Sequence, residues 1–160
     1  MKKIIYILII VGLFSCNEPV KKEKAEVKSR LLLVYEFDTI TRKNDYKLTI
    51  KNKDSFIRYE YQNLVDSTKN MTFHFVKNSN KIHFGPTEFD LKEKNIIKNK
   101  FNFDRYETEP IPDEMGSLYF NQDYGILGFD NGWGMQFHYL SDENNEQFDL
   151  PLFYKVEDLE

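Results

Sequence analysis

The sequence places two of its three histidines where they could meet across a β-hairpin and bind a metal ion. In residues 73–84, FHFVKNSNKIHF, a turn centred between Asn78 and Ser79 sets His74 opposite His83. A zinc site needs three or four ligands in a defined geometry, and no HxH or HExxH spacing accompanies this pair. We therefore expect two neighbouring histidines on a polar outer face and no metal site. His138, between two rings, is expected to point outward in the same way.

A second group with possible chemistry is acidic and lies in residues 107–116, ETEPIPDEMG. Clustered carboxylates can bind calcium or act as an acid–base pair. The spacing does not match an EF-hand, which needs ligands at alternate positions around a glycine. The two prolines favour a stiff, solvated loop instead. The carboxylates of this loop are Glu107, Glu109, Asp113 and Glu114.

Motifs that carry catalysis or bind a cofactor are not found in the sequence. It has no nucleophile elbow, no glycine-rich phosphate loop and no triad motif. Its single cysteine, Cys16, lies near the start of the chain, so the remainder can form neither an internal disulfide nor a cysteine zinc site. We expect a protein that is not an enzyme and needs no cofactor.

The only tryptophan, Trp133, lies among turn-forming residues in the stretch DNGWG, residues 130–134. A tryptophan at the exposed tip of a hairpin is a frequent recognition residue. A tryptophan packed over glycine at the start of a strand is an equally good interpretation. The pair Asn131-Gly132 is typical of a type I′ hairpin turn, because both residues tolerate a positive φ.

The elements that must position these residues are β-strands. In residues 46–51, apolar Tyr46, Leu48 and Ile50 alternate with polar residues, which indicates a strand with one buried face. An aromatic–polar–aromatic triplet places two rings on one face in five segments: 35–37, 59–61, 73–75, 101–103 and 137–139. Residues 90–97 are compatible with one or two helical turns, and no long amphipathic helix is indicated.

These patterns predict an all-β domain of eight to ten short strands in an antiparallel meander, forming a curved sheet or small barrel. A two-sheet sandwich is the alternative. The domain is expected at residues 31–160, after a signal segment at 1–15 and a flexible, charged tether at 16–30. The 14 Phe and 10 Tyr of the chain fit an ordinary packed core better than a ligand cavity, although a curved sheet could hold an apolar ligand.

The beginning of the chain, MKKIIYILIIVGLFSC, has the layout of a secretory signal: two lysines, then an uncharged apolar run too short to span a bilayer as a helix. Leu13-Phe14-Ser15-Cys16 resembles the lipobox of bacterial lipoproteins. That resemblance implies lipidation of the Cys16 thiol, cleavage of the signal helix before it and a palmitate-type anchor in the membrane. The lysine-, asparagine- and aromatic-rich composition looks like that of uncharacterised lipoproteins of the Bacteroidota. Asn17 favours the outer over the inner membrane of the cell envelope, while the side that the protein faces stays open.

Charge divides the chain unevenly. Residues 17–105 carry 19 basic and 13 acidic residues, whereas residues 106–160 carry 1 basic and 13 acidic residues. This asymmetry could steer a charged partner, or the two halves of one sheet could simply attract each other. An acidic exported protein without a basic cluster is not expected to bind nucleic acid.

Three roles follow for the domain. The first is a non-catalytic binding or interaction domain anchored through Cys16, with an envelope protein as one class of partner. The second is a carrier of a lipid or other apolar ligand in an aromatic concavity. The third is an inhibitor or immunity-type protein that binds a basic partner through its acidic C-terminal half, including Asp142, Glu143 and Glu146.

Overall fold

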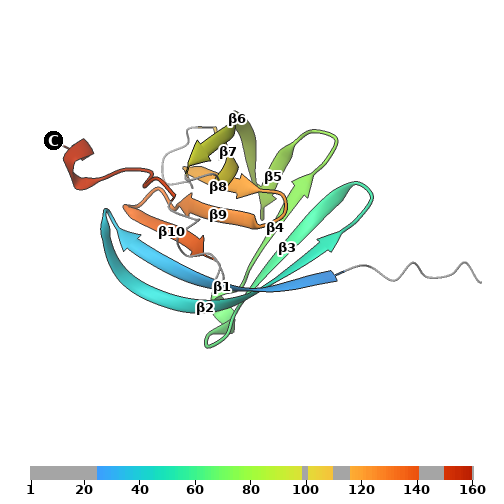
Figure 1. Ribbon diagram of the computed structural model, residues 1–160, viewed down its shortest axis with the longest axis horizontal. Coiled ribbons are helices and arrows are strands. Elements are labelled where there is room, and N and C mark those ends of the chain that lie inside the picture. Colours follow the sequence, from blue (N-terminus) through green and yellow to red (C-terminus); the bar gives the residue numbers. More distant parts are fainter. Residues whose placement is uncertain (1–24, 99–100, 110–115, 141–149, 160) are drawn as a thin grey trace, which may run out of the picture.

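The structure of the protein, a computed structural model, describes residues 25–98, 101–109, 116–140 and 150–159. Ten antiparallel strands follow one another around a closed barrel, and β1 completes the ring by pairing with β10 (Figure 1). The expected all-β meander is confirmed, in the form of a barrel and not of a two-sheet sandwich. The strands are β1 (Ala25–Glu36), β2 (Thr39–Asn52), β3 (Phe56–Asn63), β4 (Met71–Val76), β5 (Lys81–Phe84), β6 (Thr87–Lys98), β7 (Phe101–Glu107), β8 (Ser117–Asn121), β9 (Gly125–Asp130) and β10 (Met135–Leu140), with short 3₁₀ turns η2 (Ser67–Lys69) and η3 (Val156–Leu159).

The period-two pattern explains how the strands are oriented. In β3, Tyr59 and Tyr61 are fully buried inside the barrel. Glu60, between them, lies on the outer face and pairs with Lys51 of β2 at 2.9 Å. The predicted register of the β4–β5 hairpin is confirmed, with His74 opposite His83.

Three expectations about local structure are wrong. The segment assigned to the tether already belongs to the fold from Ala25 onward, because residues 25–30 pair with residues 46–51 of β2. Residues 90–97 form strand rather than helical turns, and two register shifts against β7 disturb their alternation. The β9–β10 connection spans residues 131–134 instead of a two-residue turn, with positive φ at Gly132 and Gly134 but not at Asn131.

The middle of the barrel is solid. Tyr59 of β3 meets Phe120 of β8 at 5.6 Å between ring centroids, and Phe73 of β4 meets Phe129 of β9 at 6.2 Å. Each pair joins strands five positions apart around a ring of ten, so rings from opposite walls touch. Aromatic side chains thus form the packed core that the composition favoured.

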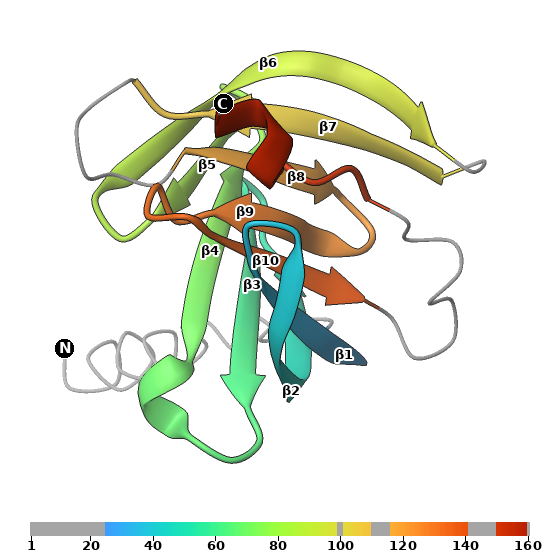
Figure 2. The ribbon, with the colours of Figure 1, turned by 90° about the vertical axis from the view of Figure 1, so that its left-hand side faces the viewer.

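A second apolar cluster covers part of the outer face. Phe153, from the segment that follows β10, stacks on Tyr119 of β8 at 4.3 Å, and Figure 2 shows this red segment crossing in front of the sheet. Buried Gln136 fixes the segment, since its Nε2 donates to the carbonyls of Phe37 (2.7 Å) and Tyr154 (2.6 Å). Its Oε1 accepts from the backbone N–H of Phe153. We call residues 150–155 the C-terminal strap.

Candidate functional site

An apolar pocket of about 320 Å³ opens at the end of the barrel where β3 leads into β4. Four rings, from β2, β5, β9 and β10, line it together with the apolar side chains of Leu32 and Met71, and four polar residues complete the lining. Small-molecule sites of proteins are concave and mostly apolar, and the mouth of a β-barrel is a frequent place for them. The four rings belong to Tyr46, Phe84, Phe129 and Phe137.

The loop between β3 and β4 closes one side of the apolar pocket and is held to the barrel by hydrogen bonds. Tyr46 donates its hydroxyl to the carbonyl of Lys69 (3.2 Å), and Asn70 accepts the backbone N–H of Asn63 (2.9 Å). At the N-cap of η2, Asp66 accepts from Thr68. The pocket wall is therefore fixed in place rather than built from a loose loop.

Two cationic side chains lie at the rim of the apolar pocket, Arg42 of β2 and Lys69 of η2. Lys69 pairs with Asp66 at 3.0 Å. For Arg42, by contrast, no hydrogen bond or ion pair is found within the described part of the chain.

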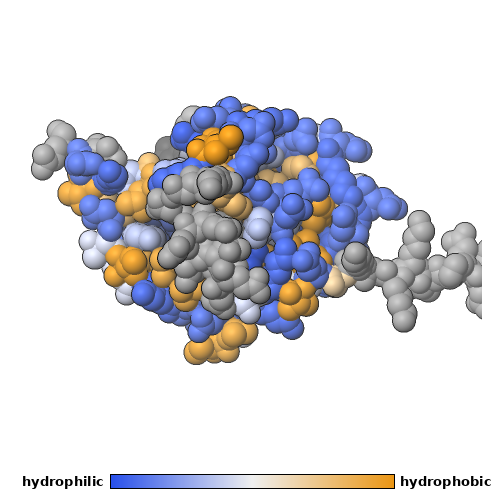
Figure 3. All heavy atoms as spheres, viewed as in Figure 1, coloured by the Kyte–Doolittle hydropathy of each residue, from blue (hydrophilic) through white to orange (hydrophobic). Residues whose placement is uncertain are grey.

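Exposed apolar side chains lie in the same loop as the pocket wall. Leu64 is 63% exposed and Val65 is 89% exposed. Figure 3 shows an orange patch at the lower tip of the molecule, over the loop between β3 and β4. Neither side chain is among the residues that line the pocket.

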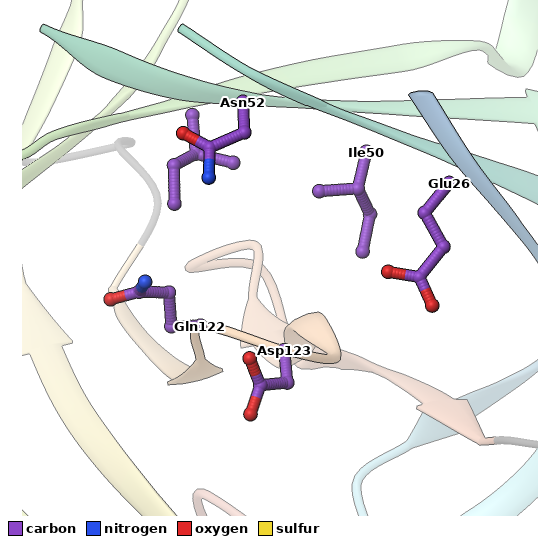
Figure 4. A pocket seen from close by; sticks show the side chains of 6 residues that line it. Glu26, Ile50, Asn52, Gln122 and Asp123 are labelled. Atoms are coloured by element: carbon purple, nitrogen blue, oxygen red, sulfur yellow. The ribbon is translucent and has the colours of Figure 1, made fainter. Parts of the chain in front are cut away.

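A second pocket, of about 370 Å³, lies at the opposite end of the barrel, where β1 begins. Figure 4 shows the carboxylates of Glu26 and Asp123 and the amides of Asn52 and Gln122 around it, with Ile50 alongside. Lys28 pairs with Glu26 at 3.1 Å and donates to the carbonyl of Asp123. This polar pocket suits a hydrogen-bonding or cationic group, in contrast to the apolar pocket.

The two facing histidines have surroundings that do not complete a metal site. His83 lies 3.6 Å from Glu88, and the ring of Phe56 packs edge-on against His74. Burial, followed by the charge of Arg58, lowers the pKa of His74. No group of three or more metal-ligating side chains occurs in the part of the chain that the structure describes.

The third histidine, His138, does not point to solvent as predicted. It does face away from the barrel interior, but the C-terminal strap and Tyr35 cover it, and only 3% of it is exposed. Its Nε2 has no hydrogen-bond partner among the described residues. Burial, aided by the positive charge of Lys98, lowers the pKa of His138 from its ordinary 6.5 to about 4.

Acidification is expected to weaken the fold through His138. Because its pKa is lower when folded, its contribution is complete above pH 6.5 and is lost as the pH falls toward about 4. The loss in unfolding free energy should reach about 3 kcal/mol. Urea unfolding across this range measures it: His138→Phe should remove most of the slope, whereas His83→Phe, on the outer hairpin, should keep it. An unchanged slope in His138→Phe would contradict this assignment.

The remaining predicted residues fall into two groups. Trp133 is 65% exposed in the β9–β10 loop. Of the two interpretations of this residue, the structure therefore shows the exposed hairpin tip and not the packed position. Glu107 pairs with Arg105, and Glu109 is exposed. Outside the described residues lie Cys16, Asp113, Glu114, Asp142, Glu143 and Glu146.

Sequence reasoning did not identify the residues of the apolar pocket as a site. Alternation places Tyr46 and Phe73 on the same inner face, yet only Tyr46 lines the pocket, while Phe73 is in the solid middle. Nothing in the sequence distinguishes Arg42 from the other cationic residues of β2 as a pocket residue.

Comparisons with known proteins give no indication of a function, so a proposal rests on the sequence, the fold and its pockets. Over the described ranges, no helix has the length and apolar character needed to cross a membrane. No family model matches the chain, and neither curated proteins nor solved structures give a match.

Proposed function

We propose that this chain is a lipoprotein of a bacterial envelope, anchored through Cys16, whose barrel binds a small apolar ligand and carries out no catalysis. The observation that carries the binding role is the aromatic-lined pocket of about 320 Å³ at one end of a barrel whose middle is filled by rings. That volume is near the lower limit of small-molecule sites, which span roughly 300–1,000 Å³. The domain thus holds a small molecule, or one end of a larger one, at its mouth.

The order of the elements suits an anchored binding domain. Eight residues separate Cys16 from Ala25, the first residue of β1, and fully extended they reach at most about 30 Å. Glu26, at the start of β1, lines the polar pocket. The apolar pocket is at the other end of the barrel, away from the point where the tether enters.

Filling the apolar pocket should weaken binding of an apolar probe. Met71→Trp places a large ring where a half-buried side chain lines the pocket, and we expect affinity for aminoanthracene, an uncharged apolar fluorophore, to fall about tenfold or more. Fluorescence titration of residues 17–160, which include all ten strands and the strap, measures it.

The matched control is Val65→Trp, in the same loop but on the exposed surface. It adds the same ring without entering the pocket and should leave affinity unchanged. Thermal unfolding checks that both variants fold. Equal binding by two folded variants, or no binding by the unmodified protein, would count against this pocket as the site.

A further inference from the structure

We infer that the ligand of the apolar pocket is an amphiphile with one short apolar chain and an anionic head, a carboxylate, held by Arg42. The inference rests on the proposed function and adds the chemical class of the ligand. Its first support is the charge of the lining: two cations and no acidic side chain face this pocket. The polar pocket has the opposite character, with two carboxylates and no cation in its lining.

Arg42 is the cation that is available for a ligand. Lys69 already has a counter-ion in Asp66 at 3.0 Å, whereas Arg42 has no such partner in the described part of the chain. Arg42 pairs in register with Val34, a fully buried residue of the barrel interior, and thus lies on the inner face of β2. A guanidinium in this position can meet a carboxylate with two parallel N–H···O bonds.

The solid core limits the apolar part of the ligand. Behind the wall residue Tyr46, the buried ring of Tyr139 packs edge-on at 5.5 Å between centroids, and Tyr61 follows at 4.6 Å from Tyr139. Behind the wall residue Phe129 lies the fully buried ring of Phe73. A chain that enters this pocket is therefore stopped by rings before the middle of the barrel. The class that fits is a short monocarboxylate, and affinity should stop rising once its chain fills the pocket.

Calorimetric titration of residues 17–160 with octanoate, octanol and octylamine at neutral pH tests the head group. Octanoate should bind about tenfold more tightly than octanol, and octylamine should bind most weakly. Arg42→Gln should remove this preference, so that octanoate and octanol bind the variant with equal affinity. Lys43→Gln is the matched control, since Lys43 pairs with Leu33 on the outer face and should change nothing.

Hexanoate adds a test of the apolar part. It should bind more weakly than octanoate by about fourfold for each methylene removed, if the chain is buried. Equal affinities for butanoate, hexanoate and octanoate would overturn the inference, because a carboxylate bound to a surface charge outside the pocket gains nothing from a longer chain.

The outcomes separate this inference from the proposed function. Equal binding of octanoate and octanol, or a full octanoate preference retained in Arg42→Gln, would overturn the anionic head and leave apolar binding intact. If the folded protein binds neither octanoate nor octanol nor the uncharged fluorophore, the proposed binding function fails as well.

Discussion

Replacing Cys16 by alanine is expected to abolish labelling of the protein with palmitate and to remove its mature form from the membrane fraction. A thioether to a diacylglyceryl group needs the Cys16 thiol, and no other cysteine can replace it. Each buried methylene contributes about 0.8 kcal/mol, so a single acyl chain holds a protein only marginally while two or three give a durable anchor. Loss of the thiol should therefore remove membrane association completely rather than weaken it by degrees. Metabolic labelling and fractionation of cells that express the full chain measure both effects.

The adjacent position supplies the control for this anchor. Ser15→Ala keeps a small residue before the cysteine and should retain labelling, whereas a bulky Ser15→Trp should impair processing. Persistent labelling of Cys16→Ala, or unlabelled wild type in a host that labels established lipoproteins, would contradict the proposed anchor. Neither result would bear on the ligand pocket, whose lining residues all lie within residues 32–137.

The parts of the fold that depend on residues close together in the sequence could be predicted from it. The β4–β5 hairpin shows this clearly, since one turn position fixed the pairing of His74 with His83. Strand order followed in the same way, because each strand pairs with its neighbour along the chain. Closure is different: it depends on Leu32 facing Tyr139 across more than a hundred residues, and no local pattern contains that pairing.

The first strand shows how polar composition can hide a strand. Residues 25–30 look like a tether, yet they continue the ladder between β1 and β2. Their one buried side chain is charged: Arg30, 2% exposed, donates to the carbonyl of Tyr124 at 3.1 Å and lies over the ring of Tyr124. Hydrophobic periodicity cannot detect a strand whose inward residue is an arginine.

The surface of the barrel explains the error at His138. The triplets Phe73-His74-Phe75 and Phe137-His138-Tyr139 have the same pattern, and in both the histidine faces away from the interior. Only the second is covered, because the C-terminal strap returns over β10 and stacks Phe153 on Tyr119. Whether a residue on the outer face is covered by another segment depends on the tertiary structure. The same holds for whether an inward-facing ring lines the pocket or packs in the middle of the barrel.

Gly125→Ala is expected to be among the most destabilising single substitutions in the barrel. A Cβ at this position would lie 2.5 Å from the hydroxyl oxygen of Tyr61 and 2.9 Å from Cδ1 of Tyr59, and Gly125 also has a φ of +83°. Both tyrosines are buried and donate their hydroxyls to nearby carbonyls, Tyr59 to Gln122 and Tyr61 to Ile126. Backbone strain, overpacking and a displaced buried hydrogen bond should together cost about 4 kcal/mol in urea unfolding.

Gly85→Ala separates the two causes of that loss. Gly85 has a φ of +56°, but a Cβ added there would meet no atom within 4 Å beyond its chain neighbours, so only the backbone term of about 1 kcal/mol applies. The steric term can be tested further in Tyr61→Phe, which removes the nearest atom: there Gly125→Ala should cost less than in the wild type. Equal losses for both glycines would mean that positive φ alone accounts for the effect. An undiminished loss in Tyr61→Phe would place the clash elsewhere, on Tyr59, because that ring is the next nearest group.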